Sequence, residues 1–418
     1  MNKITINKAV QNAFKLKAKG EKFTMLGIGP MSKTLIEAVI QLAKEKDFPV
    51  MLIASRNQVD GDAFGGGYVC GFDQKRFKKC VDDIIIKNNF NGLCYLCRDH
   101  GGPWQRDEER AAKLPVEKAM EIAKQSYVED MLAGFDLLHI DPTKDPHITG
   151  TVELDLVLNR TVELIEYLEK KRKELKLGDI GYEVGTEETN GGLTSVSAFE
   201  NFAIKLTKAL KEKGLPQPLF IVGQTGTLTR LTKNVGQYQT KEAVELTKIS
   251  NKYGMGLKEH NGDYLSNEIL LEHPAMGLDA MNVAPEFGVI ETMSYIELAA
   301  LESKFTEKDK RSRAIEVITD YAVKSERWRK WMVGDMKNAP ASEVLKDDAN
   351  KKLILEMCGH YTYEIKEVKR ELEKLKKNIN GIGLDFDFYV IKRIKDCIDR
   401  YVYCFNNYGL TSKILGER

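Results

Sequence analysis

Short apolar segments alternate with longer amphipathic segments from residue 24 to about residue 300. Most of the apolar segments are continuous and rich in Val, Ile and Leu, which is typical of strands buried on both faces. They cover residues 24–30, 49–55, 92–100, 137–141, 179–187, 218–224, 255–260 and 278–283. Between them, apolar residues recur at helical spacing, and the clearest helices are predicted over residues 32–46, 152–177, 197–213 and 241–253. In the third of these, Ser197 and Glu200 have the spacing of a capping box.

A strand followed by a helix, repeated about eight times, is the pattern of a (β/α)8 barrel. The alternative is a doubly wound sheet, which usually has fewer strands and often carries a phosphate-binding loop after the first one. The only candidate for that loop is Gly27-Ile28-Gly29, and the residues after it do not complete the glycine pattern. We therefore predict an α/β fold, a TIM barrel over residues 1–300.

The chain changes character after residue 300, where glycine becomes sparse and charge becomes dense. The periodicity is mostly helical, and Ile365, Val368, Leu372 and Leu375 share one apolar face. We predict a helical extension over residues 301–418, packed on the barrel or on a neighbouring subunit.

Composition narrows the classes of function. Of 418 residues, 63 are Lys or Arg and 62 are Asp or Glu, and this balance argues against a nucleic-acid or anionic-membrane binder. The sequence contains neither an uncharged apolar run of 18 residues nor a secretory signal pattern, so we expect no membrane span. The seven cysteines are an odd number, which fits a reducing compartment, and we expect a cytoplasmic protein. Cys94 and Cys97 lie in an apolar run, where we expect a structural strand rather than a redox or zinc site.

A barrel places its active site at the carboxyl ends of its strands, so the polar residues that end the apolar segments are the candidates for chemistry. These residues are Asn57, Gln58, Asp99, His100, Asp141, Glu187, Gln224, His260, Asp263 and Asn282. Chance also places polar residues there, because the chain leaves the core at these points. Two of only six histidines, each next to an acid, are less easily explained by chance.

His100 and His260 are candidate metal ligands, with Glu187 as a carboxylate ligand. The alternative is that each histidine only makes hydrogen bonds within its own loop. Asp99 is a candidate general base toward the same substrate. His139 lies between two apolar residues, and we interpret it as a core histidine with its hydrogen bonds satisfied. A glycine-rich segment over residues 59–71 either closes over a substrate, offers backbone N–H groups to a phosphate, or forms a tight turn.

Several short motifs occur together in one order along the chain. They are Arg56-Asn57-Gln58-Val59 with Phe64-Gly65-Gly66, Asp99-His100-Gly101-Gly102-Pro103, Ala133-Gly134-Phe135 with His139-Ile140-Asp141, Gly185-Thr186-Glu187, and Glu259-His260 with Asp263-Tyr264. In these motifs the chain resembles the Z-type, so-called non-catalytic, subunit of class II tagatose-bisphosphate aldolase. The resemblance runs along nearly the whole chain, including Trp328-Arg329-Lys330-Trp331. This family is similar in fold to class II ketose-bisphosphate aldolases, which are metal-dependent barrels, and some stand-alone relatives are ketose 4-epimerases.

The resemblance implies roles for individual residues. Asp99 would be the catalytic acid or base, His100, Glu187 and His260 would hold a divalent metal of the Zn, Mn, Co or Ni type, and Asn282 would lie near the substrate. The sequence departs from the aldolases at two places. Gln224 stands where the sixth strand of the aldolases carries a third histidine, and Asn261-Gly262-Asp263 replaces their Gly-Gly-Ser phosphate loop. An acid in that loop disfavours a phosphate by like-charge repulsion.

From these features we expect a metal-dependent epimerase or aldolase that acts on a ketose or ketose phosphate by C3–C4 aldol chemistry. C4 epimerisation is favoured because the phosphate loop is altered. Asp99, Asp141 and Glu187 are the predicted catalytic residues, with Asp141 or Asp263 as the acid for recapture. Asn57, Gln58, Gln224, Asp263 and Asn282 are predicted to bind the sugar.

The alternative function is that of a non-catalytic subunit that stabilises a Y-type aldolase chain. We also expect a homo-oligomer. A sugar kinase is not expected, because the sequence has no visible phosphate-cradling motif.

Overall fold

Eight parallel strands close into a barrel in the computed structural model, which describes residues 4–186, 193–332 and 334–417. Around the barrel the strand order is β1-β10-β9-β6-β5-β4-β3-β2. The strands are β1 (Met25–Ile28), β2 (Val50–Ser55), β3 (Cys94–Gly101), β4 (Leu137–Ile140), β5 (Gly181–Gly185), β6 (Phe220–Val222), β9 (Gly256–Glu259) and β10 (Ala280–Val283). Seven of the eight predicted apolar segments contain one of these strands, and the segment 92–100 holds all of β3 except its last residue. The predicted TIM barrel is confirmed.

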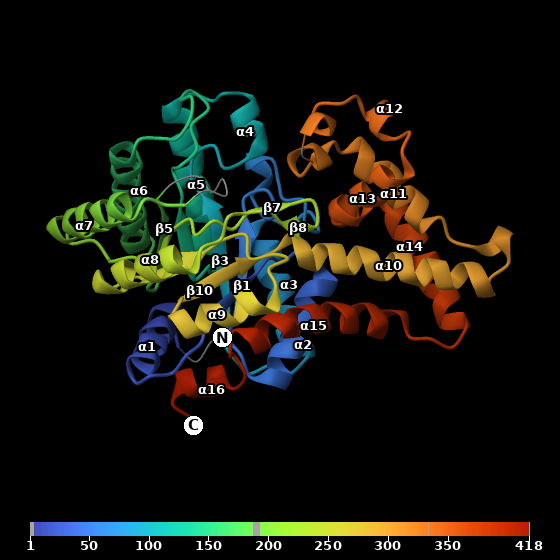
Figure 1. Ribbon diagram of the computed structural model, residues 1–418, viewed down its shortest axis with the longest axis horizontal. Helices are drawn as coiled ribbons and strands as arrows, with labels where there is room; N and C mark the ends of the chain where they lie inside the picture. The colour runs from blue at the N-terminus through green and yellow to red at the C-terminus, as the bar shows by residue number, and fades with distance from the viewer. Residues whose placement is uncertain (1–3, 187–192, 333, 418) are drawn as a thin grey trace.

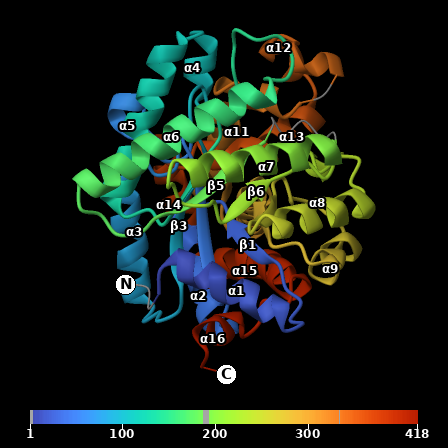
Figure 2. The same ribbon diagram turned by 90° about the vertical axis from the view of Figure 1, so that its left-hand side faces the viewer.

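Helices surround the strands (Figure 1), and Figure 2 shows α6, α7 and α8 side by side on one flank. The helices of the barrel are α2 (Lys33–Lys46), α3 (Gln74–Lys87), α5 (Val116–Ala133), α6 (Leu154–Glu174), α7 (Val196–Glu212), α8 (Thr240–Lys252), α9 (Asn267–Met276) and α10 (Pro285–Phe305). The hydroxyl of Ser32 accepts a hydrogen bond from the Leu35 N–H and caps α2. The prediction for α7 was wrong in detail, because Ser195, not Ser197, is its N-cap.

The barrel interior changes from apolar to polar along its axis. At the amino ends of the strands, α1 (Ile6–Ala18) packs against an apolar layer that includes Met51, Tyr95 and Phe220. Toward the carboxyl ends the buried side chains include Glu183 and Lys258, which are charged. Buried charges of this kind need partners, so the polar end is where chemistry is to be sought.

Four short elements lie in the loops at the carboxyl end of the barrel, and the sequence analysis did not predict them. They are a 3-10 turn η1 (Asp62–Phe64), helix α4 (Asp107–Ala111) and a small antiparallel pair, β7 (Thr229–Arg230) with β8 (Lys233–Asn234).

The extension after α10 is helical, as expected. It consists of η2 (Lys308–Lys310), α11 (Ala314–Lys324), η3 (Arg327–Lys330), η4 (Gly334–Lys337), α12 (Ala341–Val344), α13 (Asp348–Cys358), η5 (Gly359–Tyr361), α14 (Lys366–Gly381), α15 (Phe386–Cys404) and α16 (Leu410–Leu415). In Figure 1, α11 to α14 gather at one side of α10, and α15 returns along α10 and α2. The Asn407 side chain donates to the Thr24 carbonyl at 3.0 Å, so the end of the extension contacts the start of β1.

No helix among the described residues is long and apolar enough to cross a membrane. Cys94 and Cys97 are buried in β3, and neither forms a disulfide bond among the described residues. Burial raises the pKa of each thiol. Both properties agree with the structural role expected for this pair.

Candidate functional site

A cavity of about 380 Å³ opens at the carboxyl ends of the barrel strands. It is lined by most of the predicted site residues, namely Asn57, Gln58, Asp99, His100, Asp141, His260, Asp263 and Asn282. Two predicted site residues, Gln224 and Glu187, are not among the residues shown to line the cavity. Gln224 is buried, its backbone pairs with Thr194, and it is not among the lining residues. Glu187 falls outside the described residues.

The end of β3 is irregular, which brings two consecutive side chains to the same cavity. Successive side chains of a regular strand point to opposite faces. Here the pairing register with β4 shifts between Arg98 and Gly101, and His100 has a φ of 43°. Such a left-handed conformation is unfavourable for a residue other than glycine, and it is often found at functional sites. As a result, Asp99 and His100 both line the cavity.

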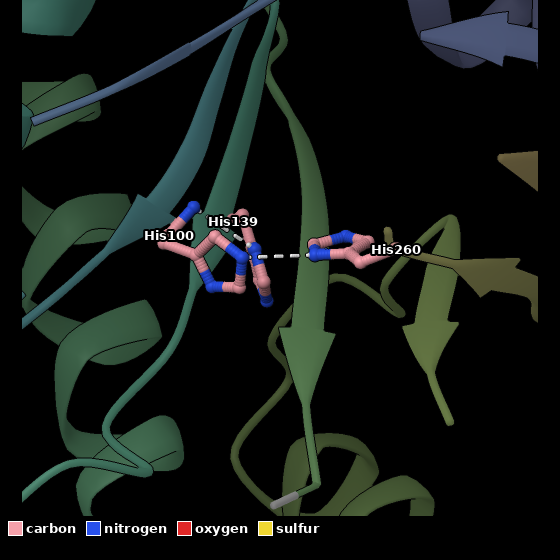
Figure 3. Close-up of side chains that lie close together, drawn as sticks. All are labelled: His100, His139 and His260. Carbon is pink, nitrogen blue, oxygen red and sulfur yellow. Dashed lines mark hydrogen bonds between the residues drawn. The ribbon is translucent and has the colours of Figure 1, made fainter. Parts of the chain in front are cut away.

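A hydrogen bond joins His100 and His260 across the barrel (Figure 3). Nε2 of His100 lies 3.0 Å from Nδ1 of His260. The outer nitrogen of each ring contacts a carboxylate: Nδ1 of His100 is 2.6 Å from Asp141, and Nε2 of His260 is 3.0 Å from Glu183. Glu183 in turn accepts a hydrogen bond of 2.6 Å from Lys258. A carboxylate behind each imidazole is the usual support for a metal-binding histidine.

His139 belongs to the same cluster, which corrects its interpretation as a satisfied core histidine. It is buried, and its Nε2 atom has no hydrogen-bond partner among the described residues. Its Nδ1 atom accepts the backbone N–H of His100 at 3.2 Å. Burial lowers the pKa of His139 to about 4, so the ring is neutral at physiological pH. The apolar neighbours of His139 in the sequence concealed the direction of its side chain.

The three histidines fit a divalent metal. One ring nitrogen from each of His100, His139 and His260 lies within 4.8 Å of the others. Neutral imidazoles are ligands for Zn²⁺ and related ions, and three of them leave a coordination position open for substrate. The Nε2 atom of His139 is a buried polar atom without a partner among the described residues. With Nδ1 accepting a hydrogen bond, this nitrogen carries the proton of the neutral ring, so ligation requires that proton to leave or move.

Asp99 lies next to this cluster. Its Oδ1 atom accepts a hydrogen bond of 3.0 Å from the side-chain amide of Asn282 and lies 3.8 Å from Nδ1 of His260. The Oδ1 atom of Asn282 has no partner among the described residues. Asn282 thus positions the Asp99 carboxylate.

Asp141 is fully engaged by its neighbours. One carboxylate oxygen contacts His100, and the other accepts hydrogen bonds from the Thr143 hydroxyl at 2.5 Å and backbone N–H at 3.2 Å. Although burial opposes ionisation, these hydrogen bonds and the charge of His100 hold the pKa of Asp141 well below its usual range. Gly102 has a φ of 129°, and a Cβ there would lie 2.5 Å from the Asp141 carbonyl oxygen, so the loop after β3 requires glycine at this contact.

Asp263 has a structural role that the sequence analysis did not foresee. Its Oδ1 atom accepts the backbone N–H groups of Ala284 at 3.1 Å and Glu286 at 2.8 Å, and so caps the start of α10. Burial and the nearby Glu286 carboxylate raise the pKa of Asp263 to about 8. The group is therefore largely neutral at pH 7, which removes the like-charge repulsion expected between this residue and a phosphate.

The extension completes the wall of the cavity. Arg327, Lys330, Trp331 and Tyr361 all line it, together with Tyr68 from the glycine-rich segment. These residues could not be assigned a role from the sequence, because nothing in a single chain indicates that segments almost 300 residues apart face the same space. Glu183 and Lys258 were also missed, although a charged residue inside a buried apolar strand was a usable signal.

Comparison with solved structures shows that the fold is shared with proteins of sugar metabolism. A probable tagatose 6-phosphate kinase from Sinorhizobium meliloti 1021 is 19% identical over 91% of this chain and 100% of that chain, with a TM-score of 0.76. Fructose-bisphosphate aldolase from Campylobacter jejuni is 14% identical over 97% and 96%, with a TM-score of 0.55. The fructuronate-tagaturonate epimerase of Cohnella laeviribosi is 10% identical over 93% and 82%, also with a TM-score of 0.55. At these identities the likeness is one of fold.

No curated protein matches the chain in sequence. A family model does match, over residues 10–382, and its description is D-tagatose-1,6-bisphosphate aldolase subunit GatZ/KbaZ-like. This match spans the barrel strands, the histidine cluster and most of the extension. The chain therefore belongs to the GatZ/KbaZ-like family of D-tagatose-1,6-bisphosphate aldolase subunits.

Proposed function

We propose that the protein is a metal-dependent enzyme that acts on a ketose or ketose phosphate by C3–C4 aldol chemistry, with C4 epimerisation favoured over cleavage. The observation that carries this proposal is that Asp99, His100 and His260 line one cavity, and a ring nitrogen of His139 lies within 4.8 Å of those of the other two histidines. Carboxylates hold the outer nitrogens of His100 and His260. A site of this composition is costly to maintain unless it binds a ligand.

His100, His139 and His260 would hold the metal, and Glu187 stays a prediction as a further ligand. When bound, a divalent cation polarises a carbonyl and stabilises the negative charge that develops beside it. Asp141 and Glu183 keep the outer nitrogens of two rings occupied, so that the inner nitrogens point to the cavity. Asn57 and Gln58 line the same cavity and are proposed to orient the sugar hydroxyls. Gln224, which does not line it, is not favoured for this role.

Asp99 is the proposed base. Its carboxylate takes the proton of the C4 hydroxyl, and the C3–C4 bond then breaks, giving an aldehyde on the C4 fragment and leaving the bond's electron pair on the C2–C3 fragment. If the aldehyde rotates within the site and the C3–C4 bond forms again on the opposite face of its carbonyl group, the product is the C4 epimer. If the aldehyde leaves, the reaction is an aldol cleavage.

The alkoxide that forms on reclosure needs a proton. Asp263 suits this task better than Asp141, because its pKa of about 8 keeps it protonated near neutral pH. Asp141 is ionised and committed to His100 and Thr143. Both acids line the cavity, and Asp263 is our proposed donor.

Retention of the aldehyde fragment favours epimerisation. Trp331 and Tyr361 of the extension line the cavity together with the barrel residues. A covered site slows the escape of a small fragment relative to its recapture.

The second candidate function is that of a non-catalytic subunit that stabilises a Y-type aldolase chain. Family membership favours it, since the family is described as an aldolase subunit. The direct contact between His100 and His260 at 3.0 Å also favours it, because the two rings satisfy each other without a ligand.

Two measurements on the purified chain separate these functions. The first is metal content. The second is incubation with fructose, tagatose and their 6-phosphates, with and without chelator. Metal near one ion per chain with chelator-sensitive interconversion of the epimers supports our proposal, and triose products indicate an aldolase. A chain that neither retains metal nor turns over any sugar after divalent ions are added, yet co-purifies with a Y-type chain, is the stabilising subunit.

A further inference from the structure

Helix α15 of the extension packs one face on its neighbours and exposes the other. It contacts α2 and α10 (Figure 1), and its side chains Val390, Ile394 and Ile398 are buried. On the outer side, Phe388 and Tyr403 are each 65% exposed. Aromatic rings bury much apolar area when they are covered, so two of them on an exposed helix face are typical of a protein–protein contact.

The outer side of α15 carries a ridge of four residues with symmetric spacing. Phe388, Lys392, Asp399 and Tyr403 lie within about 60° of one another around the helix, because each residue turns the chain by about 100°. Their separations along the chain are four, seven and four residues. Read from the other end, the separations are the same, and an acid stands where the base stood. We call these four residues the α15 ridge.

A two-fold axis matches the α15 ridge to itself. In a two-fold interface, each residue of one copy contacts a second residue of the other copy, and the same contact is made in reverse. If two α15 helices pack antiparallel about the middle of the ridge, Phe388 faces Tyr403 of the second copy and Lys392 faces Asp399 of the second copy. Paired aromatic rings and opposite charges across an interface are both favourable.

The two ends of the α15 ridge are widened by further apolar side chains. Tyr408 is exposed next to Tyr403, with ring centres 6.1 Å apart. At the other end, Leu384 and Tyr389 are exposed close to Phe388 in the sequence. An antiparallel pair of helices places one apolar end against the other, so each copy covers the apolar area of its partner.

The charged residues of the α15 ridge can change partners at little cost. Lys392 forms an ion pair with Asp396, and Asp399 lies 3.8 Å from Lys46 and accepts a hydrogen bond of 2.7 Å from the Tyr408 hydroxyl. These contacts lie at the surface, where an ion pair contributes at most about 1 kcal/mol. They therefore do not compete strongly with contacts to a second copy.

Contacts on the inner side hold α15 firmly. Arg393 forms an ion pair of 2.9 Å with Glu297 of α10, and the Tyr401 hydroxyl donates to the Gly262 carbonyl at 3.2 Å. A ridge fixed on a rigid helix loses little conformational freedom when it is covered, which favours association.

We propose that the α15 ridge is the contact between two copies of this chain, packed antiparallel about a two-fold axis. This assigns a surface to the homo-oligomer expected from the sequence. It is independent of the proposed reaction, since none of the ridge residues lines the cavity. A contact formed mainly by one pair of helices is small for a specific interface, so we expect a dissociation constant of about 1 to 10 µM.

Sedimentation velocity of the full chain at concentrations from about 1 to 100 µM measures this constant. Phe388→Ser and Tyr403→Ser should each raise it at least about tenfold, because each replacement removes an aromatic contact twice per dimer. Ile86→Ser is the control, since Ile86 is exposed on α3 and does not belong to the ridge. This control should dimerise as the unmodified chain does.

Charge reversal tests the antiparallel register. Lys392→Glu and Asp399→Lys should each weaken the dimer at least about tenfold, because each places like charges opposite one another. Mixed together, the two variants should dimerise again, because each reversed charge then faces an opposite charge on the other chain. This recovery also shows that both variants are folded. Lys208→Glu is the matched control, since Lys208 lies 3.9 Å from Glu212 in an exposed i,i+4 pair on α7.

Each other outcome overturns the inference. A chain that stays monomeric at about 100 µM does not use the α15 ridge for self-association, even if it binds a chain of another kind. A dimer whose dissociation constant is the same in all four ridge variants forms through another face. A mixture of Lys392→Glu and Asp399→Lys chains that stays as weakly associated as each variant alone excludes the antiparallel pairing. Loss of turnover or of metal, with an intact dimer, refutes only the proposed reaction.

Discussion

The Glu183 carboxylate accepts a hydrogen bond of 2.6 Å from the Lys258 ammonium group, and each side chain is only 1% exposed. Glu183 also contacts Nε2 of His260, so this ion pair joins the interior of the barrel to the histidine cluster. The Lys258 charge lowers the pKa of Glu183 well below its usual range despite burial. The carboxylate is therefore ionised and needs its partner.

Removing one member of this pair should destabilise the fold strongly. We expect Lys258→Met to lower the free energy of unfolding by about 3–5 kcal/mol, since it leaves a buried carboxylate without compensation. Chemical denaturation at pH 7 measures this. Lys252→Met is the matched control, because Lys252 pairs with Glu200 at 2.7 Å on the surface and its loss should cost less than about 1 kcal/mol. If the two variants lost similar amounts of unfolding free energy, Glu183 would not be a buried charge that depends on Lys258.

His139 should contribute to metal retention. We expect His139→Gln to lose more affinity for Zn²⁺ than the about 10- to 100-fold typical of losing a supporting hydrogen bond. Metal content after dialysis against a graded series of chelator concentrations measures this, with circular dichroism to verify folding. His147→Gln, at an exposed histidine, should retain metal like the unmodified chain. Unchanged metal affinity in His139→Gln would show that His139 is not a metal ligand and has only a structural role.

Asp99 should be required for turnover but not for metal binding. We expect Asp99→Asn to keep its metal content and to lose at least about 100-fold in turnover, because the amide cannot take the C4 hydroxyl proton. The Asn side chain still offers an oxygen to the Asn282 amide, so the local fold should persist. Steady-state kinetics and metal analysis of the same preparation test this. Activity equal to that of the unmodified chain would exclude Asp99 as the base.

Glu291 should give the fold a pH-dependent stability. It lies buried in α10, where its carboxyl accepts hydrogen bonds from Ser32 at 2.5 Å and Tyr295 at 2.8 Å. Burial raises its pKa to about 7. Between about pH 4.5 and 7 the unfolded chain releases this proton while the folded chain keeps it, so stability falls as the pH rises. Below that range Glu291 makes its full contribution to the free energy of unfolding, and above that range this contribution is lost completely.

Glu291→Gln should remove this part of the pH dependence. Denaturation midpoints measured from pH 4.5 to 8 should then fall less steeply than those of the unmodified chain. Glu297→Gln, at a partly exposed position of the same helix where the carboxylate pairs with Arg393, should retain the original slope. Parallel slopes for all three proteins would show that the Glu291 carboxyl titrates alike in the folded and unfolded chain.

The barrel could be predicted from the sequence because its strands are buried on both faces and therefore form continuous apolar runs. His100 and His260 could be found for a related reason, since each is the last residue of such a run. His139, Glu183 and Lys258 could not be assigned in this way, because they lie within runs whose other residues are core. Only the closed barrel shows that their side chains turn inward to meet one another.

The residues of the extension at the cavity were beyond sequence reasoning for a different reason. Tyr68 and Arg327 meet through tertiary packing, and no local propensity records such a contact. The same holds for Asp263, which caps a helix that starts more than twenty residues after it. Residues whose role depends on contacts between distant segments need the folded structure.

The irregular end of β3 has a consequence for how the proposed reaction could evolve. Asp99 and His100 are joined by one peptide bond, so the spacing of the proton acceptor and the electrophilic centre is a local property of the backbone. Mutations that change loop lengths or helix packing elsewhere can reshape the cavity, while the spacing between Asp99 and His100 stays the same. New sugar preferences are thus accessible by changing the walls alone, whereas a single insertion or deletion between Arg98 and Gly101 would separate the two functions at once.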